Sequence, residues 1–279
     1  MDIIRHRYSF SYECIVHPEG QLMSNLYRVC LISILLFSSS FAHASDLAKE
    51  QRWAEQIVDA IFDGEPVTLK DGELEFLAIY TPSATDKTRE AAIVMHGLGV
   101  HPDWDQVVRP LRTALPEHGW STLSLQLPVL ANGVGDEEYA PLFSEVAGRI
   151  EAGISFLKGQ GAKRIVIIAH SLGAAMGSYY LANHHPESVI GFVGIGMGSS
   201  NKPVMDNETS LKSVDVPVLD LYGENDLGDV MASAEARKQV IESKKAMLSK
   251  QKMIAGAGHF FDGKDDVLID EVSVWINAL

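Results

Sequence analysis

The chain has 279 residues, of which 46% are hydrophobic and 22% charged, a balance that suits a folded domain with a sizeable core. Its formal net charge is −14, and Lys and Arg form no continuous block. Because an acidic surface repels phosphate backbones, this composition argues against a nucleic-acid-binding protein.

The N-terminal part of the chain predicts a leader for export. Residues 1–22 show no structural pattern, and we expect them to be an extension upstream of a true start at Met23. After that methionine come the three parts of a secretory signal peptide in order: Arg28, the apolar run 29–37 and the A-x-A site Ala42-His43-Ala44. The apolar run is too short for a membrane-spanning helix.

We therefore expect cleavage after Ala44. The signal peptide is then 23–44, and the mature protein is one domain, 45–279, in the periplasm or, as the alternative, secreted. No stable membrane span is expected after cleavage. The two cysteines, Cys14 and Cys30, lie in the part removed, so neither a disulfide nor a cysteine-based metal site is predicted.

Strands alternate with helices through the mature part. A helix over 45–63 is followed by a hairpin, in which strands 67–70 and 74–80 flank the turn Asp71-Gly72. Further strands are expected at 91–95, 121–127, 165–168, 189–195, 216–222 and 251–254, and helices at 105–115, 139–158, 174–183, 230–247 and 267–279. This order predicts a mostly parallel sheet with an antiparallel N-terminal hairpin and helices on both faces. The loop 196–215 is too short for a large cap domain.

Ser171 lies between a buried strand and a helix, in the sequence Ala169-His170-Ser171-Leu172-Gly173. Small residues two before and two after a serine let the strand and the helix cross closely, so that the serine projects as in a nucleophile elbow. The start of the helix directs backbone N–H groups, that of Leu172 among them, toward the place where an oxyanion would form. This motif is weak on its own, so the serine needs partners elsewhere in the chain.

Three histidines follow Ser171 and are candidates for its base. His184 and His185 end the elbow helix, and we expect them on the surface. His259 lies in a Gly-rich turn after the last short strand, where a loop can carry an imidazole to the C-terminal edge of the sheet, and we predict it to be the base. His96 precedes the serine, and we expect it to be a structural residue beside the site.

The base needs an acid to orient it, and three carboxylates lie on or just after the strand 216–222. Asp220 is inside the predicted strand, whereas Glu224 and Asp226 follow its end. Asp226 comes after Gly223 at the spacing of a Gly-x-x-Asp turn. We predict it to be the acid that fixes the tautomer of the base, with Glu224 and Asp229 as alternatives.

Together these parts resemble the α/β-hydrolase superfamily in four motifs: His96-Gly97, Ala169-x-Ser171-x-Gly173, Gly223-x-x-Asp226 and Gly258-His259. The resemblance covers most of residues 65–279. It implies the α/β-hydrolase fold, a triad of Ser171, Asp226 and His259, and an oxyanion hole made by the N–H groups of Leu98 and Leu172. The superfamily pattern usually has glycine at the position of Ala169.

A closer resemblance lies in the stretches 96–104 and 123–128, which are similar to a family of exported proteobacterial α/β-hydrolase-like proteins of unassigned function. This resemblance implies no substrate.

The expected site is open or shallow, and an apolar acyl pocket is predicted from Trp104, Leu130 and Met197, with Met205 beside them. Because no metal-ligand cluster, phosphate loop or cofactor fingerprint is present, no cofactor is expected. We predict that Ser171 forms an acyl-enzyme from a small-molecule or lipid-like ester, with thioester, amide and peptide bonds as lesser alternatives. The alternative function is a non-catalytic protein of this fold that binds an envelope component or a partner.

Overall fold

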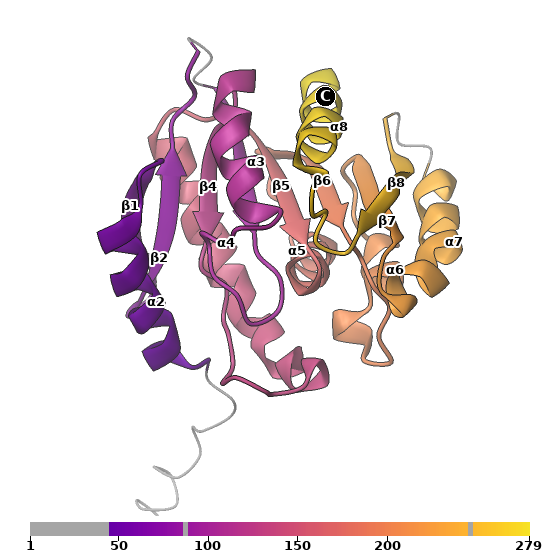
Figure 1. The fold of residues 1–279 in the computed structure, drawn as a ribbon, viewed down its shortest axis with the longest axis horizontal. Helices are drawn as coiled ribbons and strands as arrows, with labels where there is room; N and C mark the ends of the chain where they lie inside the picture. The colour runs from indigo at the N-terminus through magenta and orange to yellow at the C-terminus, as the bar shows by residue number, and fades with distance from the viewer. Residues whose placement is uncertain (1–44, 86–88, 245–247) are drawn as a thin grey trace, which may run out of the picture. The chain divides into compact units, whose positions relative to one another are not determined.

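The computed structural model describes residues 45–85, 89–244 and 248–279, so the predictions for 1–22 and 23–44 lie outside the described part of the chain. Within it, eight strands form one sheet in the order β1-β2-β4-β3-β5-β6-β7-β8 (Figure 1). The strands are β1 (Glu65–Asp71), β2 (Leu74–Thr81), β3 (Glu90–Met95), β4 (Ser121–Leu125), β5 (Arg164–His170), β6 (Val189–Ile195), β7 (Val218–Asn225) and β8 (Lys250–Gly258). β2 pairs antiparallel with both β1 and β4, and the pairs from β4 through β8 are parallel.

Helices cover both faces of this sheet (Figure 1). α2 (Leu47–Ala60), α3 (Val108–Ala114) and α8 (Asp265–Ala278) pack on one face, and α4 (Phe143–Gly159), α5 (Leu172–Asn183) and α7 (Gly228–Ser243) pack on the other. The short helix α6 (Asn207–Leu211) and the 3-10 turns η1 (Leu115–His118), η2 (Asp136–Leu142) and η3 (Pro203–Met205) lie in the connections. No helix in the described residues combines the length and the apolar character needed to cross a membrane.

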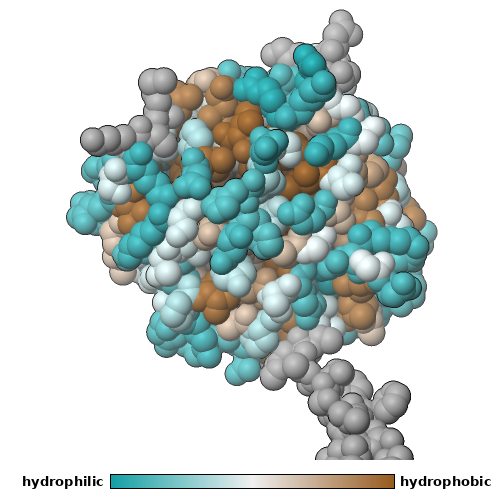
Figure 2. Space-filling view, turned by 180° about the vertical axis from the view of Figure 1, so that it is seen from behind, coloured by the Kyte–Doolittle hydropathy of each residue, from teal (hydrophilic) through white to brown (hydrophobic). Residues whose placement is uncertain are grey.

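The strand that leads to Ser171 shows why the run 165–168 is hydrophobic at every position. Ile165 and Ile167 belong to the core under α4 and α5, whereas Val166 and Ile168 belong to the core under α3 and α8. Each of these side chains is at most 1% exposed. A parallel strand with helices on both sides has no polar face, so alternation is lost. Hydrophilic residues dominate the outer surface seen in Figure 2, with hydrophobic patches among them.

The predicted architecture is confirmed, and the differences concern the ends of elements. β7 and β8 continue to Asn225 and Gly258 because they pair with each other over that length. The helix expected from 139 begins at Phe143, since the turn η2 contains Pro141. The loop 196–215 contains α6, whose first turn is capped by the side chain of Asp206.

Candidate active site

The turn between β5 and α5 holds Ser171 in a strained backbone conformation. Its φ is 55° and its ψ −122°, a region that residues with a Cβ rarely adopt. The helix passes very close to the end of β3, because a Cβ at Gly173 would lie 2.2 Å from the carbonyl oxygen of His96. The close crossing requires glycine at 173 and projects the serine at the C-terminal edge of the sheet.

Ala169 stands where the superfamily pattern has glycine, and its methyl group is buried. A Cβ placed on Gly177 of α5 would lie 3.5 Å from this methyl group, an ordinary van der Waals contact, and 3.0 Å from the ring of Phe192. The methyl group at 169 therefore packs under α5 without a clash. The sequence departs from the pattern without preventing the turn.

The structure brings the three predicted catalytic side chains into one hydrogen-bonded chain. The Nε2 atom of His259 lies 2.9 Å from the Oγ of Ser171, and its Nδ1 atom lies 2.6 Å from the Oδ1 of Asp226. Because an ionised carboxylate only accepts hydrogen bonds, Nδ1 carries the proton, which leaves Nε2 as the acceptor for the serine hydroxyl. This is the arrangement needed for a nucleophile, a general base and an orienting acid.

Asp226 is held as a charged acceptor. Its side chain is fully buried and also accepts hydrogen bonds from the backbone N–H groups of Gly223, at 2.9 Å, and Leu227, at 2.8 Å. Burial alone would raise the pKa of this carboxyl, but the hydrogen bonds from His259 and the two backbone groups outweigh burial and leave the pKa below its ordinary value. Asp226 therefore stays ionised when it orients the imidazole.

The other candidate carboxylates do not contact His259. Asp220 is fully buried and pairs with Arg237 at 2.8 Å on the α7 side of the sheet. Glu224 was expected after the strand but lies inside β7, where it accepts a hydrogen bond from the N–H of Gly256. Asp229 lies on the wall of the pocket described below.

The remaining histidines take the positions expected for them. His184 and His185 are exposed, and His185 lies 3.2 Å from Asp215. His96 is buried, and its Nε2 accepts a hydrogen bond of 2.9 Å from the N–H of Leu127, so it links the turn after β3 to the loop after β4. Burial lowers the pKa of His96 to about 3, so the ring is neutral at physiological pH.

A pocket with a volume of about 200 Å³ opens beside Ser171 and His259. Leu98 and Leu172, whose N–H groups are the predicted oxyanion donors, are both on its wall. The N–H of Leu172 belongs to the first turn of α5, where backbone donors have no acceptor within the helix. The rest of the wall has five polar residues, Asp136, Ser199, Ser200, Asn207 and Asp229, and six apolar or glycine residues: Ala175, Gly196, Gly198, Met205, Leu227 and Val230.

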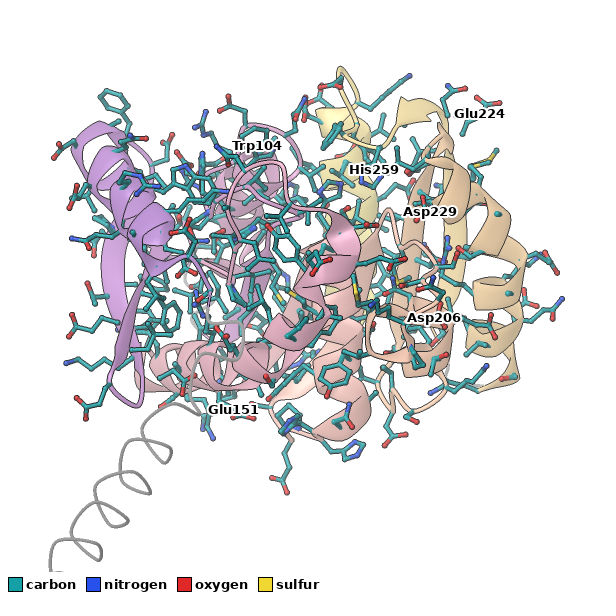
Figure 3. All side chains as sticks on the ribbon, turned by 90° about the horizontal axis from the view of Figure 1, so that it is seen from below. Trp104, Glu151, Asp206, Glu224, Asp229 and His259 are labelled. Carbon is teal, nitrogen blue, oxygen red and sulfur yellow. The ribbon has the colours of Figure 1, made fainter. Side chains whose placement is uncertain are left out.

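Trp104, Leu130 and Met197 do not line this pocket, so the predicted acyl pocket is wrong in its composition; only Met205 of that group is on the wall. Met197 is fully buried because its side chain fills the space above Gly194. Leu130 packs against the core under α4 and α5. Trp104 packs edge-on against His101 and lies away from His259 and Asp229 in Figure 3.

Most residues of the pocket wall differ from those predicted from the sequence. Ser199 and Ser200 lie on the loop after β6, and Leu227 directly follows the acid. Because Leu227 is next to Asp226 in the sequence, its place on the wall could have been predicted. No sequence pattern marks the two serines as wall residues. Across the described ranges, no group of three His, Cys, Asp or Glu side chains is placed to hold a metal ion.

Comparison with known proteins shows one family match. A family model described as "Protein of unknown function (DUF3530)" matches residues 29–141 and 136–278. No curated protein sequence matches the chain.

Three solved structures are similar to the chain. A dienelactone hydrolase from Anabaena variabilis has 20% identity and a TM-score of 0.60, over 77% of this chain and 97% of that one. Est1E from Butyrivibrio proteoclasticus has 14% identity and a TM-score of 0.60, over 77% and 98%. A monoglyceride lipase from Saccharomyces cerevisiae has 15% identity and a TM-score of 0.59, over 78% and 96%. At these identities the similarity establishes the α/β-hydrolase fold.

Proposed function

The chain belongs to the DUF3530 family of proteins of unknown function, and from its site we propose that it is a serine hydrolase that cleaves carboxylic esters through an acyl-enzyme. The observation that carries the proposal is the continuous hydrogen-bonded chain from Ser171 through His259 to Asp226. The strained turn that projects the serine supports the same function.

In the proposed first half-reaction, the Oγ of Ser171 attacks the ester carbonyl carbon while its proton passes to the Nε2 of His259. Asp226 stabilises the imidazolium that forms. The N–H groups of Leu98 and Leu172 donate to the oxygen that becomes negatively charged. The tetrahedral intermediate then breaks its bond to the alcohol oxygen, which leaves with the proton from the histidine.

The second half-reaction uses the same groups with water in place of the serine hydroxyl. His259 takes a proton from the water, the resulting hydroxide adds to the acyl carbon, and the bond to Oγ breaks as the histidine returns the proton to Ser171. Free acid and the original enzyme are the products.

The pocket wall suggests which acyl groups enter. A volume of about 200 Å³ suits a small acyl group rather than a bulky one. Asp136 and Asp229 on the wall disfavour an acyl group that carries its own carboxylate, since like charges repel at short range. We therefore propose short, uncharged acyl esters as the preferred substrates, to be tested with a panel of p-nitrophenyl esters of increasing chain length.

A fluorophosphonate probe tests the activity directly, because it reacts covalently with an activated serine. The mature protein is expected to label, and the variant Ser171→Ala is not. Absence of labelling in the wild type, or labelling that persists in the variant, would falsify the serine hydrolase and favour the non-catalytic binding protein instead.

We also propose that the protein is exported and that the mature chain begins at Ser45. The proposal is supported by the order of Arg28, the apolar run 29–37 and Ala42-His43-Ala44. N-terminal sequencing of protein recovered from the periplasm of an expressing bacterium is expected to start at Ser45. A start at residue 1 or at Met23 would contradict cleavage.

A further inference from the structure

The residue before the nucleophile also contacts the predicted base. His170 is 3% exposed, and its Nε2 atom lies 3.0 Å from the backbone carbonyl oxygen of His259. The two imidazole rings also pack together, with centroids 4.8 Å apart and planes inclined by 40°. One side chain at the end of β5 thus contacts both the main chain and the ring of His259.

The hydrogen bond to the carbonyl oxygen shows which nitrogen of the His170 ring carries the proton. A carbonyl oxygen only accepts, so Nε2 of His170 carries the proton and donates it. The titratable groups that act on this ring are His259 from the turn after β8 and Asp226 from the turn after β7, with His96 after the end of β3. The ring of Phe260 also packs against it, with centroids 5.9 Å apart. Burial, together with His259, lowers the pKa of His170 to about 4, so the ring is neutral at pH 7 and keeps a single donor.

The order of the strands in the sheet explains why His259 needs a contact that holds it near Ser171. Ser171 follows β5 and His259 follows β8, and β6 and β7 lie between these strands in the sheet. The base therefore reaches the serine on a turn that crosses two strands. Sheet hydrogen bonds between β5 and β8 cannot hold that turn in place, because the two strands are not neighbours.

Two contacts restrict the movement of His259 beside Ser171. The backbone of Gly196 lies under the ring, since a Cβ there would come within 2.9 Å of the Cε1 and Nδ1 atoms of His259. That contact limits how far the ring can move toward the sheet. The hydrogen bond from His170 holds the main chain of the same residue from the side of the nucleophile.

We propose that His170 is a positioning residue, which holds the main chain of His259 so that Nε2 stays within hydrogen-bonding distance of the Ser171 hydroxyl. This inference rests on the proposed hydrolase activity. His170 takes no proton from the substrate; it acts only through His259.

Three variants of the full mature enzyme test the role. His170→Gln keeps an amide N–H at the reach of Nε2, His170→Asn carries the amide one methylene short of it, and His170→Phe keeps a ring without a donor. Fluorophosphonate titration counts the active sites in each preparation. Their kcat and KM are then measured with p-nitrophenyl butyrate, and their melting temperatures are recorded.

We expect His170→Phe and His170→Asn to lose kcat by about 10- to 100-fold per titrated site, because a misplaced base slows proton transfer. KM is expected to change by less than about 2-fold, since no substrate contact is removed. His170→Gln is expected to keep kcat within about 3-fold of the wild type. If the Phe variant does not fold, the contrast between Gln and Asn decides the question.

Equal kcat in the wild type and the Asn variant would overturn the positioning role. So would equal losses in the Gln and Asn variants, or losses that follow the melting temperature rather than the donor. A wild type that neither labels nor turns over would refute the proposed hydrolase instead, so the two failures are distinguishable.

Discussion

At the scale of single residues, neighbouring carboxylates near the end of β7 differ in role because their surroundings differ. Asp226 faces a histidine and two backbone donors, and its pKa is lowered. Asp220 faces Arg237 in the core, where burial is the largest influence and raises its pKa despite the guanidinium. The first lies in the predicted triad and the second in the core.

Asp226→Asn is predicted to lower kcat per folded molecule by about 10⁴-fold. The amide can donate to Nδ1 and so stabilise the wrong tautomer of His259. Steady-state hydrolysis of p-nitrophenyl butyrate, corrected for the fraction of active sites, measures the effect. A variant that keeps more than a tenth of the wild-type kcat would exclude Asp226 as the acid.

Asp220→Asn serves as the matched control and is predicted to lower the free energy of unfolding by about 3–5 kcal/mol. The substitution leaves the buried Arg237 guanidinium without its negative partner. Urea unfolding followed by circular dichroism measures the loss. The kcat per folded molecule is expected to stay near that of the wild type, and a large fall in kcat without destabilisation would contradict this assignment.

Asp229→Asn is predicted to act on selectivity rather than on rate. The wild-type pocket wall carries two carboxylates, Asp136 and Asp229, and the variant removes one negative charge near an entering acyl group. The kcat/KM for the p-nitrophenyl monoester of succinate is expected to rise by about 3- to 10-fold, while that for the butyrate ester stays within about 2-fold. An equal change for both esters would contradict an electrostatic role.

At the scale of elements, the close approach of the start of α5 to the end of β3 is the most constrained contact in the site. Gly173 lies so close to the end of β3 that no side chain fits. α5 starts only one residue after the buried strand β5 ends. This arrangement requires both the hydrophobic run of β5 and the small residues around Ser171.

Gly173→Ala is predicted to destabilise the protein by about 2–4 kcal/mol and to reduce fluorophosphonate labelling of the folded fraction, because its Cβ would collide with the carbonyl of His96. Gly159→Ala is the control, since nothing lies within 4 Å of a Cβ there. At the end of α4 this control is expected to be neutral or stabilising by up to about 1 kcal/mol. Similar unfolding midpoints for both variants would contradict the close crossing.

At the scale of the whole molecule, two buried neutral histidines make the fold sensitive to acid. Burial lowers the pKa of His96 to about 3 and that of His170 to about 4, against an ordinary value of about 6.5. Between these values the unfolded chain binds more protons than the native one. Stability from these groups is therefore complete above pH 6.5 and is lost as the pH falls toward 4.

Each of the two histidines is predicted to lower the free energy of unfolding by up to about 1.4 kcal/mol for each pH unit below 6. Urea unfolding between pH 7 and pH 4.5 measures the slope. In His170→Gln one of the two titrating groups is gone, so the slope between pH 6 and pH 4.5 is expected to be shallower by that amount. Identical slopes in the variant and the wild type would contradict a neutral, buried His170.

The pattern of residues was enough to predict the order of strands and helices, the elbow and the turns that carry His259 and Asp226. These features are local, because a buried strand, a close turn or a Gly-x-x-Asp turn needs particular residues over a short stretch. The α/β-hydrolase fold followed from their order. Helix ends were less predictable, since Pro141 and the conformation of Val107, with φ 60°, decide where α4 and α3 begin.

Only the tertiary structure decided which residues line the pocket and what His170 contacts. Met197 and Leu130 are apolar, as residues of an acyl pocket are expected to be. However, Met197 packs against Gly194 and Leu130 against the core, so neither lines the pocket. His170 occupies an unspecified position of the elbow motif, yet it contacts His259, 89 residues away in the sequence. Such contacts depend on strand order and on the packing of loops between strands that are not neighbours, which no local pattern of residues encodes.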